Sequence, residues 1–170
     1  MGLQLIFCVE TNKQADTDWV YIMEAIRFRY NLPPQINLNK IYMETKSKYD
    51  SRKVLGEIEK RTKCYKGETK VIYCIDTDAY ESNYEQKQEF EKVKRFCEKN
   101  GYDLIWFCHD VEEVFLGKQV ENSQKVKAAA MFRSNKGIEH VQMQKLSATD
   151  VRSKCSNVLS VLDKYLERKE

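Results

Sequence analysis

Acidic side chains follow three segments of the chain that have the composition of buried strands. Glu10 follows LIFCV, Asp76 and Asp78 follow VIYCI, and Asp110 follows WFCH. In each case a cysteine lies two residues before the first acid, and the two-residue period of a strand places such a pair on one face. If the segments are parallel strands of one sheet, their carboxyl ends share an edge, where sheets of this class bind ligands. We therefore expect a cluster of carboxylates at that edge.

Such a cluster is unfavourable without a positive charge. Two unit charges about 4 Å apart repel by about 1 kcal/mol in water and about 4 kcal/mol at an effective dielectric constant of 20. The hard oxygen ligands of Glu10, Asp76 and Asp78 select Mg²⁺ or a similar ion. The alternative is that acids after strands cap helices. It explains one acid better than three, because the next expected helices begin later, near Thr17 and Ser82.

Other chemical signals in the sequence are weaker. His109 beside Cys108 could form a nucleophile and its base, but adjacent side chains of a strand point to opposite faces. The six cysteines include no Cys-x-x-Cys pair and show no regular spacing, which favours free thiols that pack as small hydrophobes. Most Lys and Arg residues alternate with glutamates, as on a solvated helix face. No Walker loop or Gly-x-Gly-x-x-Gly motif is present, which excludes P-loop hydrolysis.

The composition is that of a globular protein of one domain. The chain has 170 residues, 42% of them hydrophobic and 32% charged, with a formal net charge of +3. No apolar run approaches the roughly 20 residues that span a bilayer, and no signal-peptide pattern is apparent at the N-terminus. We therefore expect a cytoplasmic protein with no membrane partner.

Strand-like and helix-like segments alternate along the chain. The run at 71–75 is apolar on both faces and suits a central strand, whereas 36–43 alternates and suits an edge. The pattern predicts an α/β fold with a doubly wound, mainly parallel sheet, in one domain with a core of about 1–117 and a helical extension of about 118–170. Boundaries within 119–145 are not defined by the sequence. The expected strands are 3–9, 36–43, 71–75 and 104–108, and the expected helices are 16–30, 51–64, 82–100, 111–116 and a C-terminal helix opened by a Ser147–Asp150 capping box.

Four segments carry motifs of a known protein family: FCVETNKQADTDWVYIMEAI, VIYCIDTDAY, CHDVEEVFLG and SATDVRSKCSNVLSVL. They resemble the Toprim fold of topoisomerases, primases and nucleases. Within that family the likeness is greatest to the RloB-like and OLD-like branch, and it extends along nearly the whole chain through short motifs. The family glycine that follows the first glutamate is Thr11 here, whereas glycine lets a backbone or phosphate approach closely.

The resemblance implies metal-assisted phosphoryl transfer. Glu10 would bind metal or act as general acid or base, and Asp76 and Asp78 would hold Mg²⁺ or Mn²⁺. The remaining residues that the resemblance or the strand-end pattern suggests are the secondary acids Asp110, Glu112 and Glu113 and a phosphate contact, Lys13.

Two functions follow from the resemblance. The first is a metal-dependent nuclease or phosphoryl-transfer protein that acts on DNA or RNA in phage defence. The second is a catalytically silent Toprim-like module that binds a partner protein such as a defence ATPase. A receiver-like phosphoacceptor is disfavoured, because it needs an acidic pair after the first strand and a single acid after the third, and this sequence has the reverse.

Overall fold

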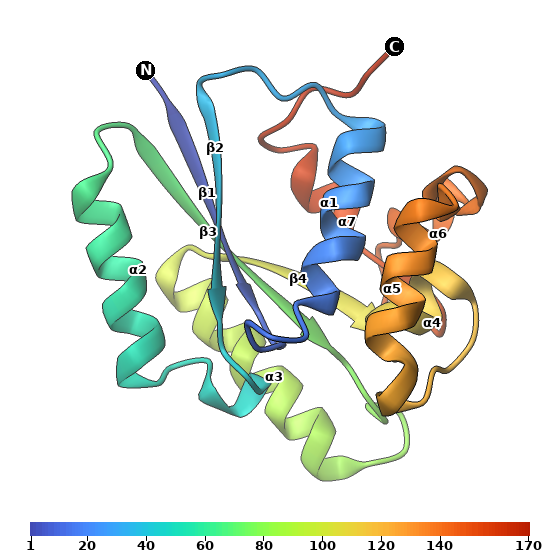
Figure 1. The fold of residues 1–170 in the computed structure, drawn as a ribbon. Helices are drawn as coiled ribbons and strands as arrows, with labels where there is room; N and C mark the ends of the chain where they lie inside the picture. Colours follow the sequence, from blue (N-terminus) through green and yellow to red (C-terminus); the bar gives the residue numbers. More distant parts are fainter.

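The sheet has five strands in the order β2-β1-β3-β4-β5, of which the first four are parallel (Figure 1). The computed structural model describes all residues 1–170. It confirms the expected α/β fold with a mainly parallel sheet. The strands are β1 (Leu3–Val9), β2 (Ile36–Tyr42), β3 (Glu68–Asp76), β4 (Asp103–Cys108) and β5 (Cys155–Ser156).

The position of each strand follows from its pattern of apolar residues. β1 lies between β2 and β3, with Leu5 aligned with Leu38 on one side and Lys70 on the other. β1 and β3 are apolar on both faces and are covered on both faces, as expected for central parallel strands. β2 is only partly buried and forms one edge of the sheet, as its alternating pattern predicts.

Helices cover both faces of the sheet, which confirms the doubly wound architecture (Figure 1). Two helices, α2 and α3, pack on one face over a core of 15 buried residues. The other helices pack on the opposite face over a core of 24. No helix combines the length and the apolar character needed to cross a membrane. The helices are α1 (Thr17–Arg29), α2 (Arg52–Cys64), α3 (Tyr84–Asn100), α4 (Val111–Leu116), α5 (Lys125–Ser134), α6 (Met143–Leu146) and α7 (Val158–Leu162), with 3₁₀ turns at Lys46–Lys48, Asn122–Gln124 and Gly137–His140.

Two helix starts differ from the sequence prediction by one residue or two. Asn83, not Ser82, caps α3, because its side chain accepts a hydrogen bond from the Gln86 N–H. Ser82 lies in the preceding turn, where its N–H donates to the Ala79 carbonyl. The helix expected at 16–30 begins at Thr17, with Asp16 in the N-cap position of α1.

The C-terminal helix is present but much shorter than the capping box at Ser147 predicts. β5 pairs antiparallel with β4, and α7 begins only at Val158. The reason is that the apolar residues of this segment belong to opposite faces of the sheet. Ala148 packs on the α2 and α3 face, while Val158 and Leu162 pack on the other. One straight helix cannot serve both faces, so the chain crosses the sheet edge at β5.

Candidate acidic cleft at the carboxyl edge of the sheet

A cleft of about 300 Å³ opens where β1 and β3 end and where α1 and α4 begin. Six of its twelve lining residues are acidic, and only Lys125 is basic. The strand-end acids Glu10, Asp76 and Asp78 therefore meet around one cavity, although 66 residues separate the first two. The acidic lining residues are Glu10, Asp18, Glu44, Asp76, Asp78 and Glu112.

Glu10 and Asp76 are joined directly. Oε2 of Glu10 accepts a hydrogen bond from the Asp76 N–H at 2.7 Å, and Oδ1 of Asp76 accepts one from the Val111 N–H at 3.1 Å. Burial raises the pKa of Glu10 to about 7, although the Asp76 N–H and the Lys46 charge oppose the shift. Burial, with the charges of Glu10 and Asp18, raises the pKa of Asp76 well above its usual range. Both groups therefore bind protons more readily than ordinary carboxylates.

Asp78 is held differently from Asp76. β3 ends at Asp76, and Asp78 has a positive φ of 51°, so the strand does not continue to it as a shared face would require. Its carboxylate forms an ion pair with Lys46, whose Nζ also donates to the Asp76 carbonyl at 2.8 Å. The Lys46 side chain is 5% exposed and that of Asp78 is 44% exposed. Lys46 thus supplies a positive charge to Asp78, one of the three strand-end acids Glu10, Asp76 and Asp78.

Asp18 is a cleft residue that the sequence prediction missed. It lies in the first turn of α1 and is 5% exposed. Burial, with the nearby charges of Glu10 and Glu112, raises its pKa well above the usual range. The signal that could have found it is an acid directly at the expected helix start after the first strand. The sequence gives no comparable signal for Lys46. It lies in a lysine-rich 3₁₀ turn, and lysines in such a segment are normally exposed to solvent.

Glu112 faces Lys125 across the cleft. Both carboxylate oxygens of Glu112 are buried and accept no hydrogen bond, and Oε2 lies 3.3 Å from Nζ of Lys125. Burial raises the pKa of Glu112, and the lysine offsets the shift only in part. Burial alone would lower the pKa of Lys125, but Glu112 and Asp110 raise it. Oε1 of Glu112 is therefore free to bind a ligand, whereas Oε2 is already ion-paired with Lys125.

Three predicted site residues do not line the cleft. Asp110 caps α4, because its Oδ1 accepts a hydrogen bond from the Glu113 N–H at 2.8 Å. Asp110 therefore caps a helix, as the alternative interpretation predicts. One oxygen of Asp76 does so too, because it accepts the Val111 N–H in the first turn of α4. Glu113 instead contacts His109. Lys13 is exposed in the loop between β1 and α1, and it is not among the lining residues.

The donor set of the cleft fits a hard divalent cation. Its ligands are carboxylate oxygens, the type that Mg²⁺ and Mn²⁺ prefer, and the two buried oxygens of Glu112 lack hydrogen-bond partners. No three of these carboxylates place one oxygen each within 4.8 Å of the others. Binding of one cation by three of them therefore requires side-chain rotation toward the cleft.

A second group of polar side chains lies at the end of β4. Glu81, Cys108 and His109 place one potential ligand atom each within 4.8 Å of the others. Cys108 and His109 were expected to point to opposite faces, but β4 ends at Cys108 and both side chains reach Glu81. No hydrogen bond joins Cys108 to His109 directly.

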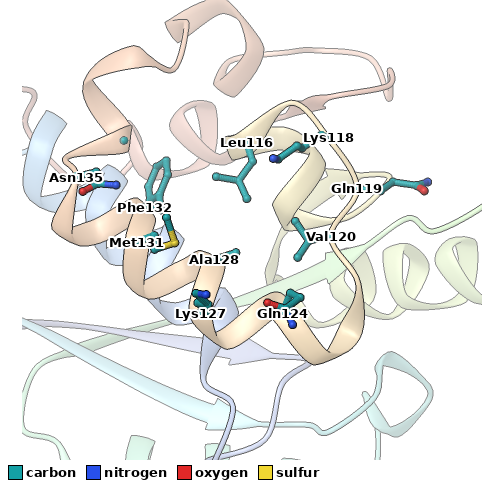
Figure 2. A pocket seen from close by; sticks show the side chains of 11 residues that line it. Leu116, Lys118, Gln119, Val120, Gln124, Lys127, Ala128, Met131, Phe132 and Asn135 are labelled. Atoms are coloured by element: carbon teal, nitrogen blue, oxygen red, sulfur yellow. The ribbon is translucent and has the colours of Figure 1, made fainter.

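The protein also has a cavity of about 530 Å³ beside α5 (Figure 2). Its lining includes Leu116, Val120, Met131 and Phe132, together with two lysines, and it contains no acidic residue, histidine or cysteine. It therefore lacks the carboxylate, imidazole and thiolate groups that bind metal ions.

Fold and site together define a doubly wound α/β protein with an acidic cleft at the carboxyl edge of its sheet. Comparisons of the chain with protein-family models, curated proteins and solved structures found no match. The function of the cleft is therefore argued from its residues.

Proposed function

We propose that this chain is a Toprim-like protein of the RloB-like and OLD-like branch that hydrolyses phosphodiesters in nucleic acid with Mg²⁺ or Mn²⁺. The observation that supports this best is the concentration of acids around the Glu10–Asp76 hydrogen bond, with only one basic residue in the lining. Ligands bind at the carboxyl edge of parallel sheets. In this proposal the protein acts in the cytoplasm, in phage defence.

The residues that would hold the metal are Glu10, Asp76 and Glu112, with Asp78 beside them. A bound Mg²⁺ would neutralise phosphate oxygens and lower the pKa of the attacking water. In the metal-free cleft, burial raises the pKa of Glu10 to about 7, and a bound divalent cation would lower it and hold the carboxylate ionised as a ligand. Lys46 fixes Asp78 and the main chain at Asp76 by its two contacts.

The substrate that this chemistry fits is DNA or RNA. Phosphate oxygens need positive partners, and Lys125 lies within the cleft. Lys13 lies on the exposed β1–α1 loop, next to the lining residues Thr11 and Asn12, from which it could contact a longer strand. Thr11 stands where the family has glycine, and its side chain leaves less room for a phosphate to approach the backbone.

The second candidate function is a catalytically silent module that binds a partner protein such as a defence ATPase. The Lys46–Asp78 ion pair favours it, because an ammonium group supplies charge that a metal would otherwise supply. The capping contacts of Asp76 and Asp110 likewise give these acids a structural use.

The experiment that separates the two functions is a cleavage assay. The full chain is incubated with single-stranded and double-stranded DNA and RNA, in Mn²⁺, in Mg²⁺ and in EDTA. We expect cleavage that requires metal and falls at least about 100-fold in Glu10→Gln and Asp76→Asn. Glu59→Gln is the matched control, because Glu59 is an exposed carboxylate on α2 paired with Lys63. Absence of cleavage from every substrate would favour the silent module, whereas cleavage unchanged in Glu10→Gln would contradict the role proposed for Glu10.

A further inference from the structure

Glu81, Cys108 and His109 form a compact group of mixed ligand atoms outside the acidic cleft. Cys108 Sγ lies 3.8 Å from Glu81 Oε1, and His109 Nε2 lies 2.7 Å from Glu81 Oε2. No other group of three acidic, histidine or cysteine side chains in the chain is as close. Glu81 comes from the turn before α3, whereas Cys108 and His109 come from the end of β4.

His109 is oriented as a metal-binding histidine commonly is. Its Nδ1 lies 2.7 Å from Glu113 Oε2, which also accepts the backbone N–H of His109 at 2.9 Å. A carboxylate that accepts the Nδ1 proton fixes the ring, so that Nε2 can offer its lone pair to a metal once the proton shared with Glu81 leaves. Glu113 is 7% exposed, so this partner is held by the fold. Glu113, which the sequence suggested as a secondary acid of the cleft, thus has a different structural partner.

We propose that Glu81, Cys108 and His109 bind Zn²⁺, with one coordination position open to solvent. Sulfur, imidazole and carboxylate together favour Zn²⁺ over Mg²⁺, and three protein ligands with an open fourth position are the usual arrangement of a reactive zinc site. Glu81 is 50% exposed and His109 is 31% exposed, so the open position can face water. The acidic cleft offers only oxygen ligands, so the two sites select different ions.

The distances suit a tetrahedral ion. From ordinary zinc bond lengths, ligand atoms around Zn²⁺ lie about 3.3 to 3.6 Å apart. The 3.8 Å between sulfur and carboxylate is close to this, and the 2.7 Å between Nε2 and Oε2 must open by about 0.7 Å. Rotation of the half-exposed Glu81 side chain accommodates that change. On binding, the Cys108 thiol proton and the proton shared between Nε2 and Oε2 leave to solvent, and bonds to sulfur, nitrogen and oxygen form.

Cobalt titration tests the proposal directly. Co²⁺ replaces Zn²⁺ in such sites, and a bound thiolate gives a thiolate-to-cobalt charge-transfer absorption in the near ultraviolet. Adding Co²⁺ to the reduced, metal-free full chain should produce this absorption, saturating at one equivalent, and Zn²⁺ should abolish it. Absence of the absorption in the unmodified chain would overturn the proposal.

Variants locate the site. Cys108→Ser should lose the absorption, whereas Cys64→Ser, which changes an exposed cysteine at the end of α2, should keep it. Because Cys108 is buried, Glu81→Gln on the exposed turn provides a variant that leaves the core intact, and we expect it to weaken Co²⁺ binding at least about 10-fold. Glu113→Gln should weaken binding about 10–100-fold. An unchanged absorption in Cys108→Ser, or unchanged affinity in Glu81→Gln, would contradict the assignment.

This inference does not depend on the acidic cleft. Glu10→Gln should leave the cobalt absorption intact, because Glu10 belongs to the other site. Loss of the absorption in Glu10→Gln, with the fold retained by circular dichroism, would contradict the separation of the two sites. If the protein cleaves no nucleic acid but still gives the cobalt absorption, the proposed nuclease function is contradicted and the zinc site is not.

Discussion

The carboxylate of Glu10 accepts a hydrogen bond from the backbone N–H of Asp76 at 2.7 Å. This contact joins the ends of the two central strands and fixes one oxygen of Glu10 against the main chain. The same main chain is held from the other side by Lys46, which donates to the Asp76 carbonyl. Two acids with raised pKa values are thereby kept side by side, at a cost in stability that a bound cation or proton would relieve.

The stability of the metal-free protein should fall as the pH rises from about 5 to 8. Glu10 has a folded pKa of about 7, raised from 4.5 by burial, so in this window the folded state binds more protons than the unfolded state. The free energy of unfolding then decreases with rising pH. We expect the melting temperature in EDTA to be at least about 4 °C lower at pH 8 than at pH 5.5. Glu10→Gln should reduce the dependence but not remove it, because burial also raises the pKa values of Asp18 and Asp76. A melting temperature that rises over this range would contradict the prediction.

Asp18→Asn should stabilise the metal-free protein at pH 8. The substitution removes a buried acid whose ionisation is disfavoured by burial and by the charges of Glu10 and Glu112, and it keeps the size of the side chain. We expect a gain of about 1 kcal/mol, which corresponds to about 2–4 °C in thermal melting. Asp150→Asn is the control, since Asp150 is exposed and should change stability by less than about 0.5 kcal/mol. A loss of stability in Asp18→Asn would show that its charge is compensated in the folded state.

Asp110→Ala should destabilise the protein through the start of α4. Its carboxylate accepts the Glu113 N–H, and loss of an N-cap costs about 1 kcal/mol. The expected fall in melting temperature is about 2–4 °C. Asp110→Asn keeps an oxygen acceptor and should lose less than half as much. Equal losses in the two variants would contradict a capping role.

Asn157→Ala should be more damaging than its partial exposure suggests. The Asn157 side chain accepts the Trp106 N–H and donates to the Leu104 carbonyl, both at 2.9 Å, and so completes the hydrogen bonding of β4 beside the short β5. Leaving these backbone groups unpaired should cost about 2 kcal/mol. Chemical denaturation measures the loss, with Asn100→Ala as the control at an exposed helix end. Similar, small losses of stability in Asn157→Ala and Asn100→Ala would contradict this role of Asn157.

Periodicity predicted the parallel core because β1 and β3 each contain an apolar run that is buried on both faces, whereas β2 alternates. The C-terminal segment could not be predicted in the same way. Residues 148–166 have helical spacing in sequence, but Ala148 and Leu162 pack on opposite faces of the sheet. That division arises because β5 pairs with the edge of β4 and the chain crosses the sheet there. The local sequence of 148–166 carries no information about that edge.

The acids at the strand ends could be predicted from sequence, since strand direction alone brings Glu10 and Asp76 to one edge. Their partners could not. Lys46 reaches Asp78 from a 3₁₀ turn 32 residues earlier in the chain, and Lys125 reaches Glu112 from a helix that follows a segment without clear periodicity. Glu81 and His109 meet only because α3 and β4 are neighbours in space.

Direct measurement of Mn²⁺ binding tests the central claim most sharply. Mn²⁺ is titrated into the metal-free protein at pH 8, and the free ion is followed by electron paramagnetic resonance. If the acidic cleft binds the metal, Mn²⁺ binding should be saturable and should weaken at least about 10-fold in Asp76→Asn. Binding should be retained in Cys108→Ser, because that substitution alters only the proposed zinc site. Absence of saturable binding, or equal affinity in the unmodified protein and Asp76→Asn, would contradict a metal-dependent role for this cleft.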